Sequence, residues 1–577
     1  MGASMPSLRS LIAVLPLALL AACATTSKSP GASPAVAAAP AVDASGASAY
    51  GLFLAGRAAM NEGRSDEAAR YYSRAARADA DGGFLNDRAF SAALLSGDIK
   101  SAAQLAPAGA DADAAVARIG ALVRAVELMA QNKGKPARAI LTGSEIGYPH
   151  KAAAALLAPW AAAMSGDAAA STARPAVGSD PIPTFFANLG QARLFERAGR
   201  FDEAETGYKA LIGGGDPGGM ATVGLGAMMQ RRGRWNDAVD LYNEALRRMP
   251  GDAGMVARRA EAQAHKAPPP LPPVRQAAAE ALMGPAAALI MQKQQEVALA
   301  YLRLALRLDP TRDAAWVLVG DILSSANDLE AAREAYMRAK PGSDQYVQAR
   351  AKLAWSYQSA GEKEAALKVA RDTVLTVPNN RDATVTLADI LRAQEQYEES
   401  ATVLDGVIAS QGDSPDWRLL YMRAVAHQQA DHWGEAEKDL QAALKIKPDE
   451  PELLNFLGYT WIDRGERLDE ALEMAKKAVA LNPQSGAMLD TLGWGYFRKG
   501  DFKKAVEQLE AAVVLEPSDP DVNNHLGDAY WRVGRTIEAQ YQWRRVLTLQ
   551  PTTKLKTEVE GKLKSGLATP PARVAGS

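Results

Sequence analysis

The chain has 577 residues, of which 48% are hydrophobic, 6% aromatic and 23% charged. Its formal net charge of −2 disfavours nucleic-acid binding, because that binding draws its affinity from the neutralisation of phosphates by a basic surface. A chain of this length exceeds one compact core, so we expect an extended stack or several domains.

The first element is an export signal. Arg9 precedes an apolar stretch from Leu11 to Leu20, which is too short to span a bilayer but has the length of a signal-peptide core. The stretch ends in Leu20-Ala21-Ala22-Cys23, which resembles the bacterial lipobox. The resemblance implies cleavage before Cys23 and its modification with acyl chains such as palmitate. Cys23 is the only cysteine of the chain and so has no disulfide partner, and an incidental or buried cysteine is the alternative.

These features predict a lipoprotein signal peptide at 1–22 and a lipidated Cys with a flexible tether at 23–48. The tether is rich in Ala, Ser, Pro and Gly, and a flexible stretch of this length spans roughly 25–30 Å. Ala24 stands where an Asp would favour retention in the inner membrane of Gram-negative bacteria. The lipobox resemblance therefore implies a lipid-anchored protein of the bacterial cell envelope, on the outer membrane and facing the periplasm.

Residues 49–264 carry a weak repeat of small and aromatic residues at helical spacing, which predicts a degenerate helical block. The two best units are formed by Gly56, Ala68, Tyr72 and Ala75, and by Gly226, Ala238, Tyr242, Ala245 and Pro250.

A proline-rich run from Pro268 to Pro273 follows this block and favours extended polyproline geometry. We predict a linker at 265–275 that acts as a semi-rigid spacer between the blocks 49–264 and 276–565. The alternative is that the prolines only cap a loop between two helices of one continuous superhelix.

The clearest pattern lies near the C-terminus, where Leu457-Gly458, Leu492-Gly493 and Leu526-Gly527 recur at spacings of 35 and 34 residues. A small residue and then a proline follow each pair: Ala471 and Pro483, Ala505 and Pro517, Ala539 and Pro551.

This pattern resembles the tetratricopeptide repeat, in which each unit is one helix-turn-helix. The resemblance implies an all-α fold, an α-solenoid that forms a right-handed superhelix in one or two blocks. About eight units are expected within 276–565, the best formed at 451–551, and a disordered tail at 566–577. The C-terminal units, together with the lipobox, also look like tetratricopeptide lipoproteins of alphaproteobacterial type.

In tetratricopeptide proteins the first helices of the units line a concave groove that binds partner polypeptides. Asn and Asp side chains there can hydrogen-bond an extended peptide, and aromatic rings supply rigid contact area. Matching those positions in this chain gives Asn455, Tyr459, Asp490, Trp494, Phe497, Asn524, Asp528, Trp531 and Arg532.

Other features of this region limit the interpretation. Trp494, Phe497 and Trp531 could instead be buried between neighbouring helices, and we expect His525 to have a polar surface or packing role. Arg532 is the only cation that can be placed in the groove, which argues against the clamp for carboxylates known from some chaperone adaptors.

The sequence lacks the H-E-x-x-H, G-x-S-x-G and G-x-x-x-x-G-K-[ST] motifs. We expect no catalytic residues, no metal, no cofactor and no small-molecule substrate. The predicted function is a membrane-anchored scaffold for protein partners in envelope assembly or peptidoglycan metabolism. The alternative is an envelope hydrolase, or its regulatory subunit, with its chemistry in the degenerate region 84–215.

Overall fold

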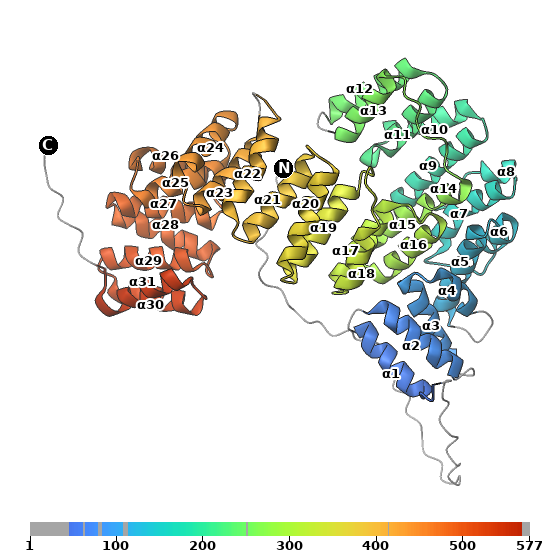
Figure 1. Ribbon diagram of the computed structural model, residues 1–577, viewed down its shortest axis with the longest axis horizontal. Coiled ribbons are helices and arrows are strands. Elements are labelled where there is room, and N and C mark those ends of the chain that lie inside the picture. Colours follow the sequence, from blue (N-terminus) through green and yellow to red (C-terminus); the bar gives the residue numbers. More distant parts are fainter. Residues whose placement is uncertain are drawn as a thin grey trace, which may run out of the picture.

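A computed structural model describes residues 45–61, 64–78, 83–107, 113–249, 252–412 and 415–567. Within these ranges the regular structure is helical and no strand is formed, so the predicted all-α solenoid is confirmed (Figure 1). The helices of the first half are α1 Ala49–Asn61, α2 Ser65–Ala78, α3 Gly83–Ser96, α4 Ile99–Leu105, α5 Ala114–Ala130, α6 Gly134–Thr142, α7 Lys151–Met164, α8 Ala168–Ser171, α9 Pro181–Arg197, α10 Phe201–Gly213, the 3-10 helix η1 Pro217–Gly219, α11 Met220–Arg231, α12 Trp235–Arg248 and α13 Ala253–Gln263.

The second half begins after the proline-rich run. Its helices are α14 Val274–Ala278, α15 Glu280–Met291, α16 Gln295–Leu308, α17 Asp313–Ser325, α18 Leu329–Met337, α19 Tyr346–Ser359, α20 Lys363–Thr376, α21 Arg381–Ala393, α22 Tyr397–Ala409, α23 Trp417–Gln429, α24 Trp433–Ile446, α25 Pro451–Arg464, α26 Leu468–Leu481, α27 Gly486–Lys499, α28 Phe502–Leu515, α29 Pro520–Arg532, α30 Thr536–Thr548 and α31 Thr553–Ser565.

The glycines of the Leu-Gly pairs let the two helices of a unit approach each other closely. A Cβ atom on Gly493 would lie 2.6 Å from Cγ of Leu509, and one on Gly527 would lie 2.6 Å from Cδ1 of Trp543. Real carbon atoms do not approach so closely, so α27 packs on α28, and α29 on α30, only with glycine at these positions. Ala505 and Ala539 are fully buried on the facing helices.

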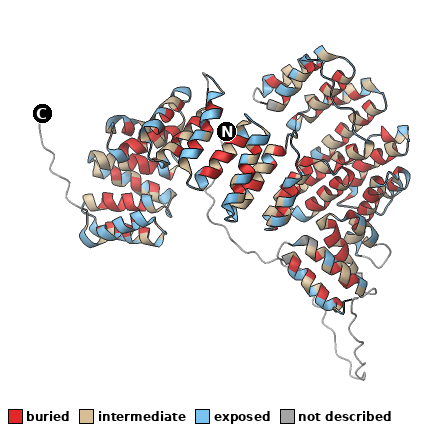
Figure 2. Ribbon diagram, in the orientation of Figure 1, coloured by how far each residue is buried: buried red, intermediate tan, exposed pale blue. Residues whose placement is uncertain are grey.

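From α15 to α30 the described helices form successive pairs, and each pair packs on the next. The first helices of the last units also contact one another directly, α25 with α27 and α27 with α29. They therefore form one layer of the stack, and the second helices α26, α28 and α30 form the other. Buried residues, red in Figure 2, occur on helices along the whole array.

The chain turns back after α13, so that helices of the second half pack on helices of the first. In Figure 1, α15 and α16 lie beside the N-terminal helices, and the contacts join α16 to α3 and α5, and α15 to α7 and α9. One apolar core contains residues of α3 to α7 and α9 from the first half and of α14 to α21 from the second, whereas α10 to α13 form a separate core with part of α9.

Polar contacts hold this junction as well. The Arg307 guanidinium on α16 donates to the carboxylate of Glu127 on α5 at 2.7 and 3.0 Å. On the same helix, the Tyr301 hydroxyl lies 2.7 Å from Nδ1 of His150, and both side chains are buried. Arg193 on α9 forms a further ion pair with Glu280 of α15.

The proline-rich run lies on the N-terminal helices. The guanidinium of Arg231 on α11 donates to the carbonyl oxygen of Pro269 at 3.2 Å, and that of Arg197 on α9 donates to the carbonyl oxygen of Pro272. The run therefore does not hold two blocks apart, because helices on both sides of it share one core.

Helix α31 closes the C-terminal end of the stack. Its Leu555 and Val559 are buried against the last unit, and Leu567 after the helix packs on the same core. The predicted tail 566–577 thus begins with packed residues, and its remainder from 568 lies outside the described residues. Cys23 and the tether up to residue 44 also lie outside them. In the part of the chain that is described, no helix has the length and apolar character needed to cross a membrane.

Candidate binding groove

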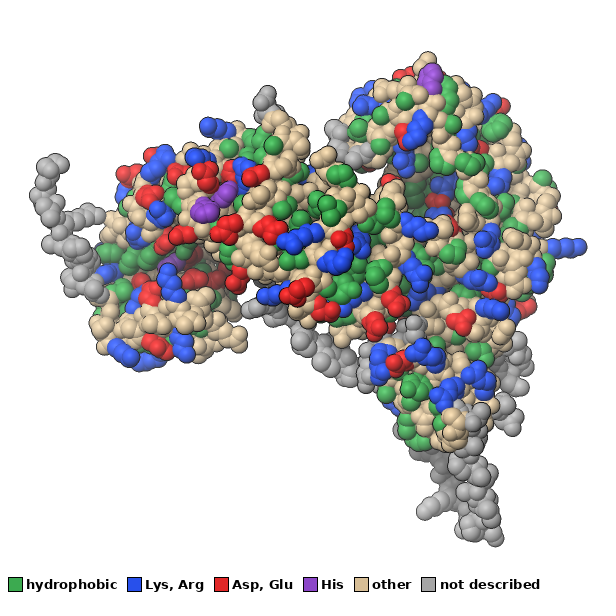
Figure 3. Space-filling view, in the orientation of Figure 1, with side chains coloured by type: hydrophobic (Ala, Val, Ile, Leu, Met, Phe, Trp, Pro, Cys, Tyr) green, Lys and Arg blue, Asp and Glu red, His purple; other side chains and the backbone are tan. Residues whose placement is uncertain are grey.

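The predicted groove residues lie on α25, α27 and α29, the first helices of the last three units. Figure 3 shows the C-terminal repeats hollowed on one side, with a His side chain in the hollow and Asp and Glu side chains around it. We call the face formed by α25, α27 and α29 the concave face. Asn455 and Tyr459 come from α25, Asp490, Trp494 and Phe497 from α27, and Asn524, Asp528, Trp531 and Arg532 from α29.

Three rings from two helices form a continuous stack on this face. The indole of Trp494 lies between the rings of Phe497, with centroids 4.7 Å apart and planes at 10°, and His525, with centroids 4.2 Å apart and planes at 14°. Trp494 and Phe497 are half-buried, and Nε1 of Trp494 has no hydrogen-bond partner among the described residues. The aromatic stack, Phe497, Trp494 and His525, thus offers a rigid apolar surface.

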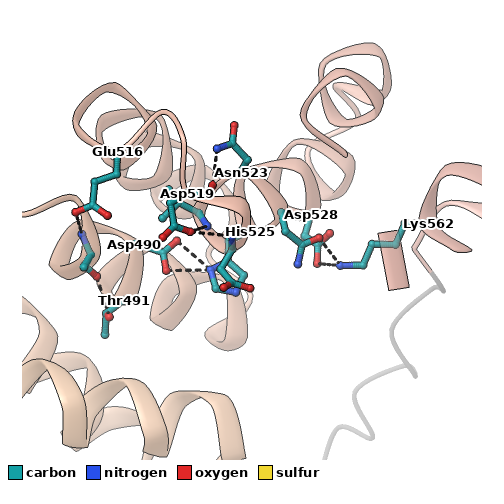
Figure 4. A network of polar contacts seen from close by, with 12 residues as sticks. Asp490, Thr491, Glu516, Asp519, Asn523, His525, Asp528 and Lys562 are labelled. Atoms are coloured by element: carbon teal, nitrogen blue, oxygen red, sulfur yellow. Dashed lines mark hydrogen bonds and ion pairs between the residues drawn. The ribbon is translucent and has the colours of Figure 1, made fainter. Parts of the chain in front are cut away.

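His525 is held in the stack by a carboxylate of the preceding unit. Its Nδ1 lies 2.9 and 3.0 Å from the carboxylate oxygens of Asp490, and both side chains are buried (Figure 4). Burial alone would lower the pKa of His525, but Asp490, with help from Asp528 and Asp521, raises it above its ordinary value of 6.5. The contact therefore stabilises the fold fully below about pH 6.5, and this stabilisation is lost as the pH rises through the raised pKa.

Two further predicted residues are used inside the protein. The Lys562 ammonium of α31 donates to Oδ1 of Asn524 at 2.9 Å and to Oδ2 of Asp528 at 2.7 Å (Figure 4). The other oxygen of Asp528 accepts a hydrogen bond of 2.9 Å from Nε1 of Trp543. Asn524 and Asp528 thus fix α31 and the helix pair of the last unit.

Trp531 faces the same closing helix. A Cβ atom on Gly566 would overlap its indole ring, and the Trp531 ring lies 5.4 Å from that of Trp543. Its apolar surface is therefore largely covered by the end of α31 and by α30. Arg532 is the next residue of α29 and is half-buried at the end of that helix.

Tyr459 lies among acidic side chains. Burial raises the pKa of its phenol, and the carboxylates of Asp463, Asp490, Asp521 and Asp519 raise it further. All four lie on or directly before the first helices, so they gather on the concave face. Asn455, one turn before Tyr459, has a buried Oδ1 without a hydrogen-bond partner among the described residues.

The structure adds groove residues that the repeat template did not select. Lys562 follows the last unit and so has no place in a template of single units. The Arg498 guanidinium donates to the carbonyl oxygen of Asp463 at 2.6 Å and lies 6.0 Å from the centre of the Trp494 ring, so Arg532 is not the only cation near the groove. His525 was expected to have a polar or packing role, but its spacing of 35 residues from Asp490 could have indicated the pair.

The region that would hold the alternative hydrolytic chemistry contains a cavity of about 480 Å³ beside α7 and α15. Its wall is mainly Ala, Val, Leu and Pro, with Lys151 and Asp180 as its charged residues. Asp180 accepts a hydrogen bond from the backbone N–H of Ile182 and caps α9.

Comparison with known families finds tetratricopeptide repeats in both halves. Models described as tetratricopeptide repeat match residues 49–81, 189–253, 313–340, 351–415 and 421–486, and one described as TPR repeat matches 495–534. The first two ranges lie where the sequence predicted degenerate units.

Several known proteins share this similarity over part of the chain. TPR repeat-containing protein PA4667 of Pseudomonas aeruginosa is 28% identical over 194 residues, which are 33% of this chain and 32% of that protein. Human protein O-mannosyl-transferase TMTC1 is 26% identical over 195 residues, 33% of this chain and 22% of that protein. The crystal structure of the APC/C hetero-tetramer Cut9–Hcn1 aligns with 90% of this chain and 96% of the matched chain, at 14% identity and a TM-score of 0.36.

The matched repeats fall on helices of the repeat stack. Residues 421–486 span α23 to α26, and residues 495–534 begin within α27 and include all of α28 and α29. The chain is a tetratricopeptide repeat protein.

Proposed function

We propose that this protein is a scaffold of the bacterial cell envelope that binds partner polypeptides on its concave face. Tetratricopeptide repeats imply protein partners, and repeats of this kind are typically non-catalytic. The observation that carries the proposal is the aromatic stack, which places two half-buried rings on α27, the helix that packs on the Tyr459 helix α25.

The stack suits binding because its rings are already fixed. Aromatic side chains dominate the binding energy of many interfaces, and a ring that is held before the partner arrives loses little conformational freedom on binding. Asp490 and the packing of α27 on α29 hold His525 and Trp494 in this way.

The proposed anchor is a lipid on Cys23, by resemblance to the lipobox. Several acyl chains on one residue are sufficient for stable membrane binding. Helix α1 lies at the lower edge of the molecule in Figure 1 and helices α29 to α31 lie at its left end, so an anchor before α1 would attach the chain at a distance from the concave face. We place the protein on the outer membrane facing the periplasm, with partners in envelope assembly or peptidoglycan metabolism.

The test is proximity labelling in the native host with a labelling enzyme fused to the full chain. We compare the unaltered chain with Tyr459→Ala and with Cys23→Ser. A matched control is Tyr541→Ala, because Tyr541 is an exposed tyrosine on α30, in the outer layer. We expect Tyr459→Ala to lower labelling of the partner at least tenfold, as for a central aromatic contact, and Tyr541→Ala to leave it unchanged.

The two parts of the proposal fail separately. Equal labelling by the Tyr459 and Tyr541 variants would remove the concave face as the binding site. Membrane association and a partner set that both survive Cys23→Ser would remove the lipid anchor.

A further inference from the structure

The concave face already binds basic side chains of its own chain. In the last three units the fifth and ninth residues of the first helix are Asn455 and Tyr459, then Asp490 and Trp494, then Asn524 and Asp528. Residues four apart lie one above the other on a helix, so each pair forms one step along the face.

Basic side chains from the following helix bind to the last two steps. Lys562 of α31 is bonded to Asn524 and Asp528 in the last step. His525 of α29 pairs with Asp490 and stacks on Trp494 in the step before. The contacts of Lys562 and His525 thus show that this face binds basic side chains.

The first step, at Asn455 and Tyr459, has acceptors and no such cation among the described residues. Oδ1 of Asn455 is buried and unbonded there, although a buried polar atom without a partner is costly. Thr491, which occupies the position on α27 that His525 occupies on α29, instead donates from its hydroxyl to the carbonyl oxygen of Ala487 at 3.0 Å. The neighbouring helix therefore does not satisfy Asn455.

The charge around the first step is negative. Asp463 follows Tyr459 by one turn on α25, and Asp521 and Asp519 approach from the start of α29. Asp463 and Asp521 are exposed, and no hydrogen bond of their side chains is found within the described residues. The nearby Arg498 directs its guanidinium to the backbone of Asp463.

We propose that the concave face binds an extended basic segment of a partner protein, with a Lys or Arg side chain of that segment beside Tyr459. The carboxylates of Asp463 and Asp521 supply the complementary charge, and the aromatic stack receives the neighbouring part of the segment. This proposal rests on the proposed function, since it names the class of polypeptide that the same face takes.

The test measures the binding of defined peptides to the full chain. The probes are fluorescein-labelled 12-residue peptides of alternating Lys and Ser, Glu and Ser, or Gln and Ser, followed by fluorescence anisotropy in 50 mM and 300 mM salt. We expect the Lys peptide to bind at least tenfold more tightly than the Glu peptide, and more weakly at the higher salt concentration.

The variant Asp463→Asn with Asp521→Asn removes two charges without a change of shape. We expect it to weaken binding of the Lys peptide about tenfold, because an exposed charge pair contributes a few-fold in affinity and two are lost. The matched control is Glu398→Gln with Glu507→Gln, two exposed carboxylates on the second helices α22 and α28. The control is expected to change affinity less than twofold, and circular dichroism checks that both variants are folded.

Equal binding of the Lys and Glu peptides, or equal weakening by the two double variants, would overturn the proposal. So would a chain shortened to 45–567 that binds the Lys peptide tenfold more tightly than the full chain, because the occupant would then be a terminal segment of this protein. If association between two copies of the chain displaced the Lys peptide, the occupant of the concave face would be a second copy. If Tyr459→Ala lowers partner labelling while peptide charge has no effect, only the basic class of the partner is wrong.

Discussion

His150 and Tyr301 are 151 residues apart in the chain, and their side chains meet inside the shared core. Burial lowers the pKa of His150 to about 4, and the charge of Arg118 contributes to this. The neutral ring and the Tyr301 hydroxyl share a hydrogen bond at Nδ1, and burial also raises the pKa of Tyr301, so both groups are uncharged. The buried pair therefore favours an uncharged His150.

This preference predicts a loss of stability in mild acid. A pKa lowered on folding means that the unfolded chain binds the extra proton, so the contribution is present above about pH 6.5 and is lost as the pH falls toward 4. The full difference corresponds to about 3 kcal/mol, and about 2 kcal/mol is lost between pH 7.5 and pH 5.

The measurement is hydrogen–deuterium exchange of α7 and α16, corrected for the intrinsic effect of pH. The double variant His150→Phe with Tyr301→Phe has no such titration, so its opening free energy should fall by about 2 kcal/mol less than that of the unaltered protein over this range. An identical fall in both would show that other groups control the junction.

The repeat template placed the predicted residues on the first helices, because their positions follow directly from the Leu-Gly spacing. Tyr459, Trp494 and Phe497 are half-buried there, whereas Asp490 is buried and paired with His525. Asn524, Asp528 and Trp531 have the same spacing but are engaged by Lys562, Trp543 and Gly566. A local pattern cannot show this, since α31 lies beyond the last unit.

At the scale of elements, α31 stabilises the last unit through one buried charge pair as well as through its apolar side chains. Lys562→Met would leave the buried carboxylate of Asp528 without its cation, and breaking such a pair typically costs about 3 kcal/mol. Amide exchange in α29 and α30 should become about a hundredfold faster.

Two further variants test the cause. Lys556→Met changes an exposed lysine on the same helix and should leave the exchange unchanged. Adding Asp528→Asn to Lys562→Met removes the unpaired charge and should restore part of the protection. If Lys556→Met had the same effect as Lys562→Met, the charge pair would not be the source of stability.

Helix pairs in the second half were predictable because Gly493, Ala505 and their counterparts in other units repeat a requirement for close packing. The packing of the second half on the first half was not predictable from the sequence. Arg307 and Glu127 form their contact across 180 residues, and neither belongs to a motif that indicates its partner. The proline run suggested a spacer because its composition describes local stiffness and not what lies beside it.

At the scale of the whole molecule, the shared core makes the two halves depend on each other. The N-terminal helices bury Leu122, Val126 and Met129 in the same core as Leu302 and Leu304 of α16. A fragment 45–264 would expose this surface to water, and contiguous apolar surface drives association.

We therefore expect fragments 45–264 and 265–567 to form a stable complex when they are expressed together. Expressed alone, fragment 45–264 should be digested by trypsin far faster than in the complex. Size-exclusion chromatography and limited proteolysis measure both effects. If fragment 45–264 resisted trypsin alone and did not bind 265–567, the two halves would be independent domains.

The packing of α15 and α16 on the N-terminal helices also has a mechanical consequence. A repeat array in which each unit touches only its neighbours extends under load like a spring. Here α14 to α16 are held by contacts with α3, α5, α7 and α9, which lie far away in the sequence. Helices α23 to α31, the C-terminal arm, contact only adjacent units. With the proposed lipid anchor at the N-terminus, a pulling force from a bound partner would therefore bend the C-terminal arm before it deformed the shared core.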